Sequence, residues 1–164
     1  MFEGKQDLEK QLTRRLRGYL VPKVRFVVLR DQDAGDCVVV KGRLRDRCVA
    51  AGRADAIVRI ACREIESWYL ADLAAVERGL GVVNLSRWQA KKAYQAPDAI
   101  HSPARELRRL APSYQKIAGS RAIAPHLDIE NRRSRSFANF ISAVQRAAAE
   151  LDEGAPAKSS VSGG

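Results

Sequence analysis

Two aspartates stand one residue apart where the most apolar short run in the first half of the chain ends. The run is VRFVVL, residues 24–29, and Asp31 and Asp33 follow it in the stretch LRDQDAGDC. Residues i and i+2 of an extended segment point to the same side, so both carboxylates can face one ion. Mg²⁺ and Mn²⁺ prefer oxygen ligands, and Mg²⁺ usually takes only one or two protein carboxylates. The spacing predicts a Mg²⁺ or Mn²⁺ site; the alternative interpretation is a solvated turn that ends a strand.

A second acidic pair, Glu64 and Glu66, lies in the stretch REIESWYLAD. Two positions on a helix are separated by about 200°. Both side chains can therefore reach one site only if Glu64 belongs to a strand end or a turn, which makes Glu64 the stronger candidate metal ligand. The alternative for Glu66 is an acid in the first turn of a helix, where the helix dipole favours it. Trp68 is predicted in the core, and Asp72 at the surface.

A third acid stands near the start of the chain. Glu3 and Gly4, in FEGKQD, resemble a loop that places one carboxylate at the beginning of a helix. The cysteines form no close pair in the sequence and give neither a disulfide framework nor a zinc signature. Cys48 and Cys62 are expected to be small buried residues in a reducing cytoplasm.

These acids need a fold that positions them, and the first half of the chain has a βαβ pattern. We predict helices over residues 5–20, 36–51 and 64–78 and strands over residues 24–29 and 56–62. A strand–helix–strand order indicates a parallel sheet. Sites in open α/β sheets form beyond the carboxyl ends of the strands. Both acidic pairs should therefore reach the same edge of the sheet.

The second half of the chain is predicted to be helical. Its expected helices cover residues 86–95, 103–111, 113–124 and 135–151. We expect one domain over residues 1–152, with an α/β part (1–80) that carries the acidic site and a helical part (81–152). Residues 153–164, EGAPAKSSVSGG, are predicted to be a disordered tail.

The charge of the chain is its strongest global property. Lysine and arginine number 29 against 19 aspartates and glutamates, a formal net charge of +10. This excess favours a polyanionic partner, nucleic acid above all, although the alternative is simply a basic solvated surface. The candidate nucleic-acid contacts are Lys91, Lys92, Arg105, Arg108, Arg109, Arg132, Arg133 and Arg135. No apolar stretch approaches the ~20 residues needed to cross a bilayer, and MFEGKQDLEK has no apolar centre, so we expect a cytoplasmic protein.

The order of these motifs resembles a known pattern. An EG loop leading into a helix, a strand ending in DQD, and REIESW after a further strand are similar to the Toprim fold of topoisomerases, primases and overcoming-lysogenization-defect nucleases. More closely, the chain resembles the bacterial domain-of-unknown-function family DUF4276, with a Toprim-like core. That likeness extends to YQKIAGSRAIAPHLD and RSRSFANF and covers roughly residues 2–145.

The resemblance implies a role for each acid. Glu3 would be the general acid or base, Asp31 and Asp33 would bind Mg²⁺, and Glu64 and Glu66 would complete the site. It also implies a partner ATPase and a place in phage defence. Toprim cores have an apolar strand directly before the EG loop, where this sequence has only Met1 and Phe2. The first core strand is therefore expected to be missing or truncated.

Three functions are compatible with these observations. The first is a Toprim-like Mg²⁺-dependent nuclease that cleaves phosphodiester bonds in nucleic acid. The alternative is a catalytically inactive, basic nucleic-acid-binding or complex subunit. A third hypothesis is an enzyme for a small phosphorylated substrate, although the sequence has no glycine-rich phosphate loop of the type G-x-x-x-x-G-K-[ST].

Overall fold

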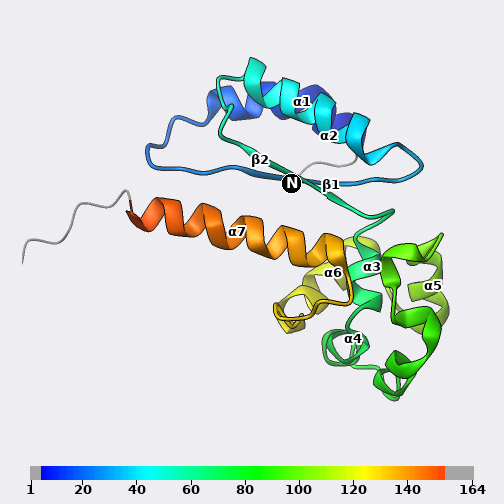
Figure 1. The fold of residues 1–164 in the computed structure, drawn as a ribbon. Coiled ribbons are helices and arrows are strands. Elements are labelled where there is room, and N and C mark those ends of the chain that lie inside the picture. Colours follow the sequence, from blue (N-terminus) through cyan, green and yellow to red (C-terminus); the bar gives the residue numbers. More distant parts are fainter. Residues whose placement is uncertain (1–4, 154–164) are drawn as a thin grey trace, which may run out of the picture.

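The computed structural model describes residues 5–153, so Glu3 and all but the first residue of the predicted tail lie outside the described part (Figure 1). The chain forms a mixed α/β fold, as predicted. Its elements are, in order, α1 Lys5–Gly18, β1 Val27–Asp31, α2 Cys37–Ala50, β2 Ile57–Ala61, α3 Glu66–Leu70, α4 Leu73–Leu80, α5 Pro103–Leu110, α6 Lys116–Ile123 and α7 Arg135–Glu153, with short 3₁₀ turns η1 Ser86–Ala90, η2 Lys92–Tyr94, η3 Pro97–Ala99 and η4 Ala124–His126.

The two strands pair in parallel through the crossover helix α2, which confirms the predicted βαβ unit. Val27 lies opposite Ile57, and Asp31 lies opposite Ala61. The strand begins later than predicted, because Lys23 has a left-handed φ of 54° and the first bond to β2 is the one that Phe26 O accepts from Ile57 N. The strand also ends two residues later than predicted, so Asp31 is its last residue.

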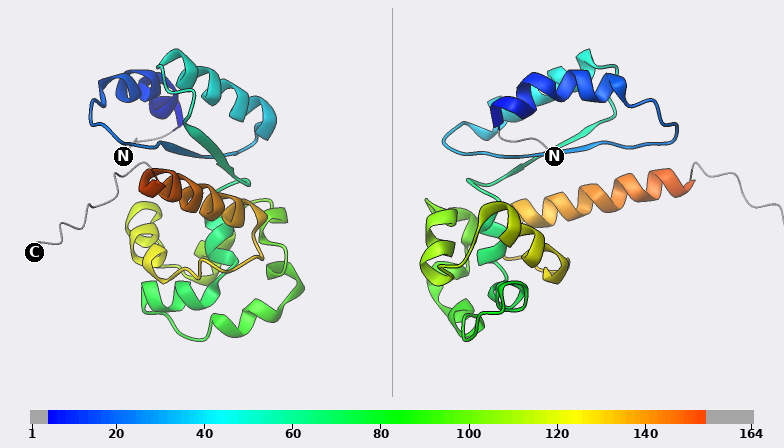
Figure 2. Two further views of the ribbon diagram at one scale, coloured as in Figure 1. Left: turned by 60° about the vertical axis from the view of Figure 1, so that its left-hand side comes forward. Right: turned by 180° about the vertical axis from the view of Figure 1, so that it is seen from behind.

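Two layers of helix enclose the sheet (Figure 2). Helices α1 and α2 cover one face, where Leu8, Leu12 and Leu16 are buried, and α7 covers the other. The core on the α1–α2 side also contains Val28, Val40, Leu44, Cys48, Ala51 and Val58, and the core on the α7 side contains Ala61, Trp68 and Phe137. Each fully buried leucine or valine stabilises the fold by roughly 1.5–3 kcal/mol. The predicted stripe of α1 stops before Leu20, which follows the helix and is 86% exposed.

The helix predicted over residues 64–78 is wrong in one respect, since it is broken at Ala71–Asp72 into α3 and α4. Asp72 Oδ1 accepts a hydrogen bond from Ala75 N, and its Oδ2 accepts one from Asp128 N, each at 3.0 Å. Asp72 is therefore an N-cap that starts a new helix, and it is 8% exposed where a surface position was predicted. Trp68 is buried as predicted.

The second half is helical as expected. Helices α5 and α6 are shorter than predicted, whereas α7 is longer and includes Glu153, the first residue of the predicted tail. Residues 86–95 form two 3₁₀ turns separated at Lys91, whose backbone is extended. Ser134 Oγ accepts a hydrogen bond from Phe137 N and so caps the start of α7. Side chains from α3 to α6 make a third core, which includes Tyr69, Leu70, Leu73, Val76, Leu107, Tyr114 and Ile123.

Candidate functional site

The four predicted acids of the described chain lie beyond or at the carboxyl ends of the two strands. Asp31 closes β1, and Asp33 follows in the loop; Glu64 and Glu66 follow β2. The loops are tied together, because Gln32 N donates to Ala61 O and Asp33 N donates to Arg63 O. The expected convergence at one sheet edge is therefore present in the backbone, but the side chains divide into two groups.

The first group is centred on an ammonium. Lys116, the first residue of α6, places its Nζ 3.4 Å from Asp31 Oδ2 and 4.0 Å from Glu66 Oε1. The other oxygen of Asp31 accepts a hydrogen bond of 2.8 Å from Ile65 N, just before α3. Asp31 thus links β1 to two helices, and one cation is shared between two carboxylates.

Glu66 is unusual among the acids of the described residues, because it is 0% exposed. Its Oε1 accepts a hydrogen bond from Tyr114 OH at 3.0 Å, while Oε2 is buried and has no hydrogen-bond partner among the described residues. Burial raises the pKa of Glu66 and that of Asp31; the nearby Lys116 ammonium opposes the rise in both. A buried carboxylate oxygen without a donor is costly, and a bound cation would satisfy it.

The second group surrounds a surface hollow of about 380 Å³. Its lining residues are Asp33, Ala34, Arg63, Glu64, His101, Ser102, Ala104, Arg105 and Arg108. Glu64 does not reach the Lys116 group by hydrogen bonding. Its Oε2 instead accepts from Ala104 N at 2.8 Å and so caps α5, whose own N-cap residue Ser102 makes no side-chain cap bond.

A metal site of three or more ligands is not preformed in this region. No three His, Cys, Asp or Glu side chains within the described residues are grouped closely enough to hold a metal ion. Asp31 and Glu66 form a pair, and Mg²⁺ often uses only one or two protein carboxylates because it retains several waters. The three cysteines are free; Cys48 is buried as predicted, whereas Cys62 is half-buried.

The predicted nucleic-acid contacts are spread over the helical half. Arg105 and Arg108 line the hollow, beside two of the predicted acids. Arg109 is instead held within the fold, since it donates to both oxygens of Glu106 and holds the pKa of that carboxyl down at about 2. Lys91 lies 3.4 Å from the centre of the Trp88 ring. The remaining four, Lys92, Arg132, Arg133 and Arg135, are exposed and away from the lining of the hollow.

Four residues of this region were not among the predicted site residues. They are Arg63, His101, Tyr114 and Lys116. Lys116 and Tyr114 lie within YQKIAGSR, which the sequence singled out only as a long family-like stretch, and no local spacing relates them to Asp31 or Glu66. Tertiary structure brings them to Asp31 and Glu66 from distant parts of the sequence.

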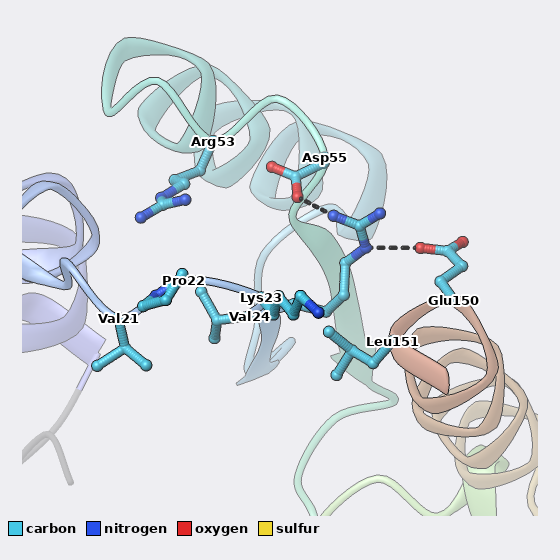
Figure 3. Close-up of a pocket in the computed structure, with 9 residues that line it drawn as sticks. Val21, Pro22, Lys23, Val24, Arg53, Asp55, Glu150 and Leu151 are labelled. Carbon is cyan, nitrogen blue, oxygen red and sulfur yellow. Dashed lines mark hydrogen bonds and ion pairs between the residues drawn. The ribbon is translucent and has the colours of Figure 1, made fainter. Parts of the chain in front are cut away.

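A second hollow, of about 330 Å³, lies at the opposite, amino end of the strands (Figure 3). Arg25 lies between two acids there, 3.1 Å from Asp55 and 2.8 Å from Glu150 of α7. Val21, Pro22, Val24 and Leu151 provide apolar walls. Arg53 donates to Tyr19 O and lies over the Phe26 ring. Its arginines are thus engaged within the fold.

Comparison with family models identifies a match to a domain of unknown function (DUF4276) over residues 2–145. The chain belongs to this family. The match covers both the sheet with its acidic edge and the helices that supply Lys116 and the arginines of the hollow. Comparisons with curated proteins and with solved structures found no match. Within residues 5–153, none of the helices has the length and apolar character required to span a membrane.

Proposed function

We propose that this DUF4276 chain is a Mg²⁺- or Mn²⁺-dependent phosphodiesterase of Toprim-like ancestry that acts on nucleic acid. The observation that supports it most is the pair Asp31 and Glu66. These carboxylates come from different elements, share one cation, and leave a buried Glu66 oxygen without a hydrogen bond. Such a pair fits a divalent ion by charge and by ligand chemistry.

The residues divide the chemistry between them. Asp31 and Glu66 would hold the ion, and a bound divalent ion stabilises the attacking and leaving oxygens of an in-line displacement at phosphorus. Asp33 and Glu64 line the neighbouring hollow with Arg105 and Arg108, whose guanidinium groups suit phosphate oxygens. Glu3, outside the described residues, stays the candidate general acid or base that the resemblance implies. The partner ATPase and the phage-defence role rest on that resemblance too.

A second candidate function has an observation of its own. Lys116 already supplies a positive charge to Asp31 and Glu66, and Asp31 and Glu64 each accept a backbone hydrogen bond at the start of a helix. Acids whose oxygens are used for ion pairs and helix caps within the fold are also compatible with a basic nucleic-acid-binding subunit that has no catalytic activity.

Calorimetric titration with Mg²⁺ and Mn²⁺ separates the two candidates. We expect the native chain to bind one or two ions, and Asp31→Asn and Glu66→Gln to bind them at least tenfold more weakly and to lose cleavage of nucleic acid. Both variants keep an oxygen for the hydrogen bonds from Ile65 N and Tyr114 OH, so the fold should persist. Asp46→Asn, on the exposed side of α2, is the matched control. Absence of ion binding, with salt-sensitive nucleic-acid binding retained, would favour the inactive subunit.

A further inference from the structure

Arg63 follows β2 in a backbone conformation that an arginine rarely adopts. Its φ is 60°, and Asp33, which faces it across the end of the sheet, has a φ of 55°. The two are bound to each other, because Asp33 N donates to Arg63 O at 2.8 Å, and Arg63 N donates to Gln32 Oε1 at 3.3 Å. Left-handed non-glycine residues cost free energy, persist where their surroundings fix them, and gather at functional sites.

Three arginines line the hollow beside this strained pair. Arg63 comes from the end of the sheet, and Arg105 and Arg108 come from α5. Among the described residues, none of the three guanidinium groups forms a hydrogen bond or an ion pair, although Asp33 and Glu64 line the same hollow. Arginines that do not pair with neighbouring carboxylates keep their donors for a ligand.

We infer that Arg63, Arg105 and Arg108 form a phosphate-binding site for one nucleotide unit. Arg63 is its inner contact, because it is half-buried whereas Arg105 and Arg108 are exposed. Guanidinium groups bind phosphate through paired, charge-assisted hydrogen bonds. The hollow holds about 380 Å³, which suits a nucleoside phosphate better than a bare phosphate ion. The hollow is lined by three arginines and two acids, so its net charge is positive. One oxygen of Glu64 already accepts a hydrogen bond from Ala104 N.

The hydrogen bonds of this region explain how the site is held together. Glu64 fixes the start of α5 to the end of β2, and the Asp33–Arg63 bond fixes the two strand-end loops to each other. The arginines on α5 are thereby kept beside Arg63. This inference deepens the proposed function by placing a phosphate-bearing nucleotide next to the Asp31–Glu66 pair, and it rests on that proposal for the identity of the ligand as part of a nucleic acid.

The test is a binding titration without divalent ions, in EDTA, with a short fluorescent single-stranded oligonucleotide and with a nucleoside monophosphate as competitor. We expect Arg63→Gln to weaken binding by about tenfold or more, as the loss of a charge-assisted contact does. Arg45→Gln, which removes one exposed charge from α2 away from the hollow, should change binding less than twofold.

Arg63→Gly separates a ligand contact from a structural role. Glycine adopts a φ of 60° without cost, so this variant should melt no lower than the native chain and still bind weakly. Native affinity in Arg63→Gln, or a loss equal to that of Arg45→Gln, would overturn the inference. Nucleotide binding without ion binding or cleavage would overturn the proposed function alone. Cleavage with native affinity in Arg63→Gln would overturn this inference alone.

Discussion

The two ends of the sheet carry hollows of similar size but opposite character. At the amino end, Arg25 is paired with Asp55 and Glu150, and Arg53 is engaged by a carbonyl and an aromatic ring. At the carboxyl end, three arginines of the hollow have no ion pair among the described residues, and Glu66 keeps a buried oxygen without a hydrogen bond. Left-handed residues occur at both ends, but only Asp33 and Arg63 are bonded to each other.

This difference distinguishes a structural ion pair from a candidate site. Charges that stabilise a fold are satisfied by the fold itself, as around Arg25. Charged groups that bind a ligand lack partners within the protein, and the stability of the rest of the fold compensates for this cost. The carboxyl end has this second pattern, so we expect substitutions there to change ligand binding, and substitutions at the amino end to change stability slightly and binding not at all.

The largest expected effect comes from Gly119 in α6. A Cβ at this position would lie 2.5 Å from Tyr114 Cδ2 and 2.7 Å from its Cε2, and the buried Tyr114 ring has little room to move. Gly119→Ala should destabilise the fold by about 1–3 kcal/mol. It should also displace the Tyr114 hydroxyl from Glu66. Thermal melting measures the loss, and Gly42→Ala, where the added Cβ meets nothing within 4 Å, is the control.

Lys116→Gln removes the cation shared by Asp31 and Glu66. If a divalent ion uses these carboxylates, Mn²⁺ should bind up to about tenfold more tightly to the variant, because a competing and repelling charge is gone. Added Mn²⁺ should then raise the melting temperature more in the variant than in the native chain. Calorimetry gives the affinities. Unchanged Mn²⁺ affinity would show that the ion does not bind beside Lys116.

The buried acids give the carboxyl end a pH dependence. Burial raises the pKa of Asp31 and of Glu66 in the folded chain. The folded state therefore holds these protons more tightly than the unfolded state, and the stability that they contribute is fully present below about pH 4 and decreases as pH rises through the raised pKa values.

Glu66→Gln, which mimics the protonated acid, should flatten this decrease. Melting temperatures between about pH 4 and 7 measure it, with the exposed Asp46→Asn as the control. A native slope in Glu66→Gln would show that Glu66 does not titrate in this range.

The smallest effect is expected at the amino end. Arg25 and its partners Asp55 and Glu150 are well exposed, and exposed ion pairs contribute little. Arg25→Gln should cost less than about 1 kcal/mol and leave ion and oligonucleotide binding at native values. A loss of binding equal to that in Arg63→Gln would remove the contrast between the two ends.

The sequence predicted the sheet and its acidic edge because both depend on local patterns. Apolar runs located β1 and β2, and the helical pattern between them located α2, each to within three residues at its ends. The break at Asp72 was missed because it depends on a distant donor, Asp128 N, which no spacing reveals. The single four-acid site was expected from backbone convergence alone, and the side chains separate because Glu64 turns to cap α5.

The sequence could not predict which basic residues lie beside the acids, because these contacts also join distant parts of the chain. Lys116 approaches Asp31 across 85 positions of the chain, and Tyr114 approaches Glu66 across 48. Arg105 and Arg108 were predicted as contacts only by their charge, as were Arg109 and Arg132, which the fold pairs with Glu106 and Glu130. Net charge indicates a kind of partner, but tertiary structure determines which of the arginines remain available to it.

The bond between Glu64 and Ala104 N connects helix α5 to the acids of the candidate site. A carboxylate oxygen that caps a helix cannot coordinate a cation along the same direction at the same time. Any cation that recruits this oxygen would therefore remove one hydrogen bond from the start of α5, the helix that carries Arg105 and Arg108. Binding of a cation by Glu64 and binding of a phosphate by the arginines of α5 would then be energetically coupled through this one hydrogen bond.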